Sequence, residues 1–219
     1  MKLYLVNFLI KIPALMIAMT CHGYAQAYMA DKLGDKTPKF EGRLSLNPFA
    51  HIDILGFIMF LAVGFGWSKS VNISGRNFKN FRKDDLKVSI IGPLSNLILA
   101  FLCSIILAIL FVLVKGDVMI LNILQAIITQ TLIFNVLFGV LNLLPLPGFD
   151  GFRILTDLFP RKTYKLQNIA SKYSIYILIA VIVPFLPGGY SVISFLISKP
   201  TNAIIALLNK FIFFIVGIF

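Results

Sequence analysis

Cysteine and histidine are scarce in this 219-residue chain, which contains two of each. Both cysteines, Cys21 and Cys103, fall in apolar segments, and their placement indicates neither a disulfide nor a cysteine-ligated zinc site. Acidic side chains are also few, with nine Asp and Glu against twenty Lys and Arg, so the net charge is +11. The apolar run from Leu3 exceeds the length of the apolar h-region of a signal peptide, so no cleavable signal peptide is expected.

Apolar residues are abundant by contrast. They make up 58% of the chain, with a mean hydropathy of +0.91, whereas a soluble domain is usually about 45–50% apolar. Several runs approach or exceed the roughly 20 residues that cross a bilayer core. The apolar segments lie at about 3–30, 88–114, 119–143, 174–187 and 190–219. The pattern predicts an all-α polytopic membrane protein in which residues 1–219 form a single integral membrane domain.

Basic residues gather in three stretches between these runs. Residues 31–53, 68–87 and 152–172 carry four, six and five of the twenty Lys and Arg. The positive-inside rule places such stretches on the cytoplasmic face, which explains the net charge without a nucleic-acid partner. The resulting topology puts the first residue outside and the C-terminus on the cytoplasmic side.

Residues 54–67 form an apolar run that is too short to span a membrane. As a helix they cover about 20 Å, against a hydrocarbon core of about 30 Å. If the run dips in and returns, the basic stretches on both sides of it share one face, so a re-entrant segment is expected. Alternating residues at 39–46 also predict a short strand or hairpin arm.

Two places carry polar residues within or beside membrane helices. His22 and Gln26 lie one helical turn apart and therefore share a face. At residues 142–151, prolines end a helix beside a single acid, Asp150. Each place alone has a plain structural explanation, as a histidine satisfied by a neighbouring helix or as an aspartate that caps the next helix. Together they lie at similar depth on one side, and a histidine facing a carboxylate there is typical of a metal site.

Five motifs, in this order along the chain, resemble the site-2 protease family of intramembrane zinc metalloproteases, in its compact prokaryotic branch. They are HGYAQAYMADKLGD at 22–35, GRLSLNPFAHIDILG at 42–56, GFGWSKSVNISGRNFKN at 64–80, GPLSN at 92–96 and NLLPLPGFDG at 142–151. The first motif departs from the family pattern, and the other four follow it. The resemblance implies a site-2 protease-like helical bundle in a prokaryotic inner membrane.

The resemblance also implies roles for single residues. Family members bind zinc through both histidines of an H-E-x-x-H helix and the aspartate of the last motif, and the glutamate is the general base. Carried over, His22 and Asp150 match the first and third ligands. Gln26 occupies the place of the second histidine as a weak ligand, and Gly23 occupies the general-base position without a proton acceptor. Zinc is the family cofactor, and both substitutions argue against its retention in this chain.

Three further residues are candidates for contact with a bound peptide. Asn96 and Asn142 can donate hydrogen bonds to a peptide carbonyl, or to neighbouring helices. His51 is the other histidine of the chain. It is a candidate rescue ligand for a metal, or a residue that positions the 54–67 segment.

The leading interpretation is a catalytically impaired pseudoprotease that binds transmembrane or membrane-proximal segments of partner proteins in the lipid bilayer. One alternative is an active intramembrane zinc metalloendopeptidase with altered metal ligands. A second alternative is a transporter-like bundle, against which the small number of intramembrane polar residues argues.

Overall fold

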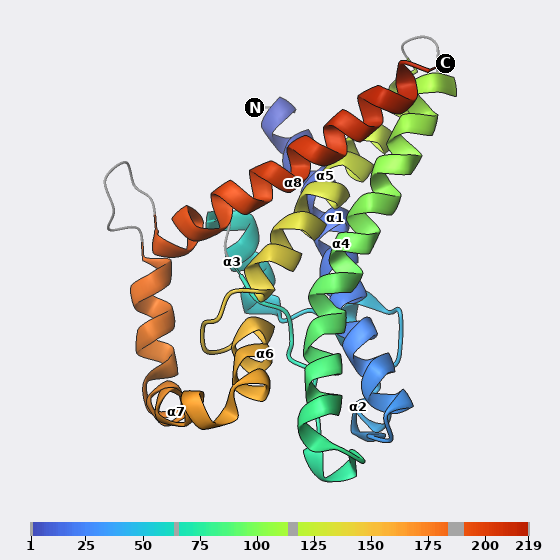
Figure 1. Ribbon diagram of the computed structural model, residues 1–219. Helices are drawn as coiled ribbons and strands as arrows, with labels where there is room; N and C mark the ends of the chain where they lie inside the picture. The colour runs from blue at the N-terminus through green and yellow to red at the C-terminus, as the bar shows by residue number, and fades with distance from the viewer. Residues whose placement is uncertain (1, 64–65, 114–117, 184–190, 219) are drawn as a thin grey trace.

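The computed structural model describes residues 2–63, 66–113, 118–183 and 191–218 (Figure 1). The described residues form eight α-helices and two short 3₁₀ helices, with no β-sheet among them. The elements are α1 Lys2–Lys32, α2 Thr37–Phe40, η1 Pro48–Ala50, α3 Ile54–Val63, η2 Gly75–Asn77, α4 Phe81–Leu113, α5 Met119–Asn142, α6 Asp150–Leu158, α7 Pro160–Ile182 and α8 Val192–Val216. Four helices are long and apolar enough to cross a membrane: α4, α5, α8 and the part of α1 from Phe8 to Lys32. The predicted all-α, multi-pass membrane fold is therefore confirmed.

The centre of the bundle is formed by α1, α4 and α5, which pack against one another (Figure 1). On α1, the small residues Ala14 and Ala18 are fully buried in a cluster with Phe134 and Phe138 of α5. Small side chains let helix backbones approach closely in a membrane, where burial alone gives little drive for association. His22 and Gln26 lie on α1, the motif at 92–96 lies on α4, and the motif at 142–151 runs from the end of α5 to the start of α6.

The chain from 52 to 68 leaves the bundle and returns to where it started. Ile52 pairs with Ser68 in an isolated antiparallel bridge, and the Lys69 amide donates to the His51 carbonyl at 2.9 Å. Between these points α3 has ten residues, about 15 Å of helix, and Phe60 packs it into the α1–α5 cluster. This path agrees with the re-entrant interpretation of residues 54–67, of which Gly64 and Phe65 lie outside the described residues.

The short strand or hairpin arm expected at 39–46 is not formed. The chain instead makes the last turn of α2, followed by a turn at Gly42 with φ of +72°. A buried side chain holds this segment in place of a strand ladder. The Arg43 guanidinium, 3% exposed, donates to the carbonyls of Ala50 and Ser70.

The C-terminus lies away from the basic stretches, contrary to the expected topology. Leu178 and Val181 of α7 pack beside Leu141 at the end of α5, so α7 stops at that level and does not cross the bundle. The next helix, α8, starts at the same level and ends with Ile212 packed near the far end of α4. The end of α8 therefore lies on the same side as the start of α1 (Figure 1). The prediction was wrong because it counted residues 174–187, of which 184–187 lie outside the described residues, as a crossing.

A buried carboxylate joins the end of α1 to the basic loop that precedes α4. Asp35 is fully buried and accepts hydrogen bonds from Thr37 N and Oγ1, from Ser74 N and from Asn77 Nδ2, at 2.6–3.1 Å. Burial alone would raise the pKa of this carboxyl, but the four hydrogen bonds outweigh it and the pKa of Asp35 is lowered.

Replacing Asp35 by alanine is expected to lower the free energy of unfolding by about 2–4 kcal/mol, because several donors lose their acceptor in a buried place. The measurement is denaturant unfolding of the protein in mixed micelles. Asp31→Ala is the control, since Asp31 pairs with the half-exposed Lys36 at 3.0 Å, and a surface pair contributes about 0–1 kcal/mol. Equal losses in both variants would contradict the assigned role of Asp35.

Candidate functional site

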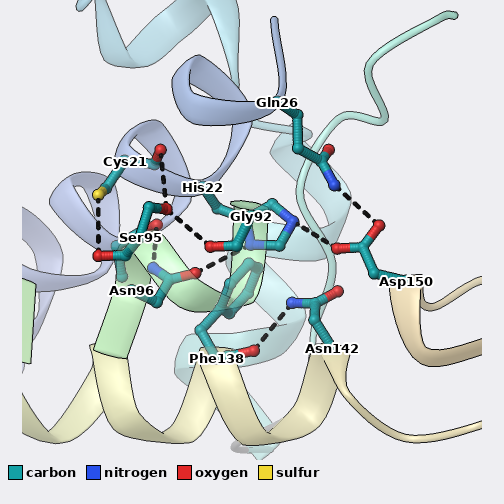
Figure 2. A network of polar contacts seen from close by, with 10 residues as sticks. Cys21, His22, Gln26, Gly92, Ser95, Asn96, Phe138, Asn142 and Asp150 are labelled. Atoms are coloured by element: carbon teal, nitrogen blue, oxygen red, sulfur yellow. Dashed lines mark hydrogen bonds and ion pairs between the residues drawn. The ribbon is translucent and has the colours of Figure 1, made fainter. Parts of the chain in front are cut away.

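The polar residues of α1 meet the acid at the start of α6 (Figure 2). His22 Nε2 lies 3.0 Å from Asp150 Oδ2, and Gln26 Nε2 donates to Asp150 Oδ1 at 2.8 Å. All three residues are buried, with exposed fractions of 5%, 5% and 7%. They converge because one helical turn aligns His22 with Gln26, and because Asp150 is the first residue of α6.

A chain of asparagines holds the second ring nitrogen of His22. His22 Nδ1 lies 2.9 Å from Asn96 Oδ1 on α4 (Figure 2). Asn96 Nδ2 donates to the Ala18 carbonyl at 2.9 Å and to Asn135 Oδ1 at 2.8 Å, so the amide oxygen of Asn96 must face the imidazole. His22 Nδ1 therefore carries a proton, and Nε2 is the nitrogen that faces Asp150.

Close packing of α4 and α5 also confines the His22 ring. A Cβ at Gly92 of α4 would lie 2.7 Å from His22 Cε1 and 2.9 Å from Gln26 Nε2, so only glycine leaves room for both side chains. On the other helix, the Phe138 ring meets His22 edge-on, with ring centroids 5.5 Å apart. The orientation of the imidazole is thus set by packing as well as by hydrogen bonds.

Gly23, in the general-base position, faces a second imidazole. A Cβ on Gly23 would lie 2.4 Å from His51 Nδ1, far inside normal contact distance. His51 itself is fully buried. The space next to the general-base position is therefore filled by the His51 ring, and glycine is the residue that makes room for it.

Hydrogen bonding determines which nitrogen of His51 is protonated. His51 Nε2 lies 2.7 Å from the Ser45 carbonyl, which can only accept, so Nε2 carries the proton. The buried Nδ1 then presents a lone pair and has no hydrogen-bond partner among the residues that the structure describes. Burial lowers the pKa of His51 more than the Ser45 hydrogen bond raises it, and the charge of Arg43 lowers it further. The ring is therefore neutral at physiological pH.

A cavity of about 210 Å³ lies beside the contact between α1 and α6. His22, Gln26 and Asp150 form one part of its wall, and residues 66–71, which follow α3, form another. Asn142, at the end of α5, also lines it. The site is thus a small recess with polar and apolar residues in its wall, which come from segments far apart in the chain.

The sequence matches one protein family over most of its length. The profile of Peptidase family M50 covers residues 5–185. The chain belongs to this site-2 protease family. It is 38% identical over 183 residues to "Putative zinc metalloprotease YwhC" of Bacillus subtilis (strain 168), and the match covers 80% of each chain. It is 26% identical over 189 residues to "Putative zinc metalloprotease Rip2" of Mycobacterium tuberculosis (strain ATCC 25618 / H37Rv), over 84% of this chain and 70% of the relative. No solved structure matches the chain.

The three residues of this M50 protein that were candidates for peptide contact differ in whether they line the cavity. Asn142 lines the cavity, and its Nδ2 donates to the Phe138 carbonyl at 2.9 Å. Asn96 is fully buried, and both ends of its amide are engaged within the protein. His51 is fully buried against Gly23 and is not part of the cavity wall. Asn142 is thus the one of the three that a bound chain can reach directly.

Two contributions to the site were not predicted. Asn135 orients Asn96, and its own Nδ2 donates to the Thr131 carbonyl at 2.8 Å. An amide within the otherwise apolar run 132–141 is the signal that points to it. Residues 66–71 line the cavity because the bridge between Ile52 and Ser68 returns them to the site, and no local pattern reports that pairing.

The donors of this M50 protein do not fit a zinc ion. Catalytic zinc sites use three protein ligands at about 2.0–2.3 Å from the metal. His22 and Asp150 supply two such donors, with Nε2 and Oδ2 3.0 Å apart, but Gln26 directs an N–H, which cannot be a ligand, at the same carboxylate. No group of three or more His, Cys, Asp or Glu side chains that could hold a metal occurs in the described parts of the chain. Cys21, next to His22 in sequence, donates to the Ser95 carbonyl at 3.6 Å.

A group of charged residues ties α6 to α4 next to the cavity. Arg153, which lines the cavity, donates to Asp85 on α4, and Asp157 faces the same carboxylate. Burial, followed by the negative charge of Asp85, raises the pKa of Asp157 to about 7, although Arg153 and Arg82 act in the opposite direction. The position of α6, and so of Asp150, depends partly on this charge balance.

Substituting Gly23 by alanine is expected to lower the free energy of unfolding by about 1–3 kcal/mol, because the new Cβ overlaps the His51 ring. In a His51→Ala background, which removes that ring, the same substitution should cost clearly less. The measurement is a double-mutant cycle of unfolding free energies in mixed micelles. Strict additivity of the two substitutions would show that His51 does not occupy this space.

The raised pKa of Asp157 predicts a pH dependence of stability. Between about pH 4 and pH 7 the folded state holds a proton that the unfolded state releases, so Asp157 destabilises the fold increasingly as pH rises. Asp157→Asn removes this effect, and the melting temperature of the variant minus that of the wild type should grow from pH 5 to pH 8. Asp31→Asn is the control. A difference that stays constant with pH would contradict the assignment.

Proposed function

We propose that this protein is a catalytically impaired member of the site-2 protease family, which binds transmembrane or membrane-proximal segments of partner proteins without cutting them efficiently. The observation that carries this proposal is the His51 ring against Gly23. The space next to the position of the base is occupied by a neutral side chain whose proton-bearing nitrogen is bonded to Ser45.

Loss of the base has a direct kinetic cost. Glycine has no group that can accept a proton from water, and general-base catalysis typically contributes about 10²–10⁴-fold. His51 Nδ1 carries a lone pair, but it is buried against α1 and is not part of the cavity wall. The rate of any residual hydrolysis is therefore expected to be low.

The absence of the second histidine is expected to weaken metal binding. Without a third strong ligand, His22 Nε2 and Asp150 Oδ2 face each other at 3.0 Å, and Gln26 donates to the other carboxylate oxygen. Because His22 Nδ1 already carries the proton that faces Asn96, this contact is favourable only with a second proton between Nε2 and Oδ2. With that proton in place neither buried partner is left unpaired, and a metal would have to displace the proton in order to bind.

Space for a partner segment is retained. The cavity is continued by a groove of about 530 Å³ between residues 67–70 and α7, which Asp53, Ile175 and Ile179 also line. Together they form a recess that is polar at the site and apolar toward α7. This combination suits a membrane-proximal segment of another chain, which would lie next to Asn142.

Zinc content is the decisive measurement. The purified wild-type protein should carry far less than one zinc per chain by elemental analysis, because it offers two strong ligands. Gln26→His adds the third ligand and should raise the zinc content toward one per chain. Adding Gly23→Glu should then restore cleavage of a model transmembrane substrate, most effectively when His51→Ala provides space for the new side chain.

Near-stoichiometric zinc in the wild type would overturn the proposal if His22→Ala or Asp150→Ala abolished it. Cleavage by the wild type that a chelator stops would identify an active metalloprotease with altered ligands. Gly23→Glu without Gln26→His is the matched control. It supplies a base without a metal ligand and should leave both zinc content and cleavage unchanged.

A further inference from the structure

Helix α7 carries a stripe of positive charge along its first four turns. Arg161, Lys165 and Lys172 lie with Asn168 within about 60° around the helix, at 100° per residue. All four are exposed, and α7 contains no acidic residue. We call these four residues the basic stripe. Lys162 lies next to it on the same side of the helix.

The basic stripe faces away from the protein. Thr163 and Ala170, the buried residues of α7, lie on the opposite side of the helix. The helix stands at the edge of the bundle, where it packs against α6 and α8 (Figure 1). No salt bridge in the described part of the chain involves a cation of α7. The charges of the stripe are thus not neutralised within the protein.

Exposed aromatic and apolar side chains surround the basic stripe, as is typical of a helix at a membrane surface. Tyr164, Ile169 and Tyr176, 52–70% exposed, flank the stripe. After Lys172 the same helix continues without a charge to Ile182. Tyrosine rings are enriched at the boundary between headgroups and acyl chains. Charge, aromatic rings and apolar residues therefore follow one another along α7 in the order of the layers of a bilayer.

We propose that the basic stripe of α7 binds the headgroups of anionic phospholipids. The cations extend over about 16 Å of helix, which suits a layer of phosphates better than a single ion. Basic residues next to a membrane are attracted by anionic lipids. Binding there places α7 at the headgroup layer and keeps it next to the groove that it forms with residues 67–70.

The test compares the association of spin-labelled phosphatidylglycerol and spin-labelled phosphatidylcholine with the full-length protein in phosphatidylcholine bilayers, by electron paramagnetic resonance. The wild type should bind the anionic lipid about fivefold more strongly, the factor expected for a basic residue close to an anionic surface. Raising the salt concentration should reduce this preference. In the variant R161Q/K165Q/K172Q the preference should fall close to one.

Two variants make the test specific. R161K/K165R/K172R keeps the charges and should keep the preference. R76Q/K79Q/K83Q removes three exposed cations from the loop before α4 and the first turn of α4, and should leave the preference nearly unchanged. Equal losses in both glutamine variants would overturn the proposal, since the effect would then reflect total charge. A wild type without any preference would also overturn it, and would point to an acidic protein partner for this face.

Discussion

The contact between His22 and Asp150 is the interaction on which the rest of the site depends. It joins α1 to α6 in a buried place, where an unpaired polar group would be costly. Each neighbouring feature allows or completes it. Gly92 gives α4 room beside the ring, and Asn96 fixes the protonated nitrogen. The turn after α5 brings Asp150 to the start of α6.

Gly23 and Gln26 are a consistent pair of changes when viewed with their neighbours. Gln26 gives the carboxylate a neutral donor, which an imidazole bound to a metal would not provide. Gly23 removes a side chain from a position that the His51 ring fills. Gln26 thus pairs Asp150 within the protein, whereas Gly23 makes room for the His51 ring, whose Nδ1 has no hydrogen-bond partner among the described residues. Contacts within the protein therefore occupy the positions of the base and of the second histidine, and a cavity remains beside them.

Charge and hydropathy predicted the path of residues 54–67 better than they predicted the side on which the chain ends. The short run at 54–67 was expected to return to its starting level, and the pairing of Ile52 with Ser68 agrees with this. The C-terminus was misplaced, because the apolar half of α7 was taken for a crossing. That half is covered on one side by Leu141 and Phe149, so it is apolar without spanning. An apolar run of this length is compatible with either arrangement, and contacts with other helices decide between them.

The sequence by itself determined the membrane fold, the protease family and the meeting of His22, Gln26 and Asp150. Hydropathy, helical spacing and short motifs are local properties, and the regular geometry of a helix determines which of its residues share a face. Only the tertiary structure showed that the His51 ring lies against Gly23, and on which side of the bundle α8 ends. It also showed that Asn96 and Asn135 serve His22. These features depend on overlap and hydrogen bonding between distant segments, such as the His51 ring against α1, and no local pattern records which distant atoms come into contact.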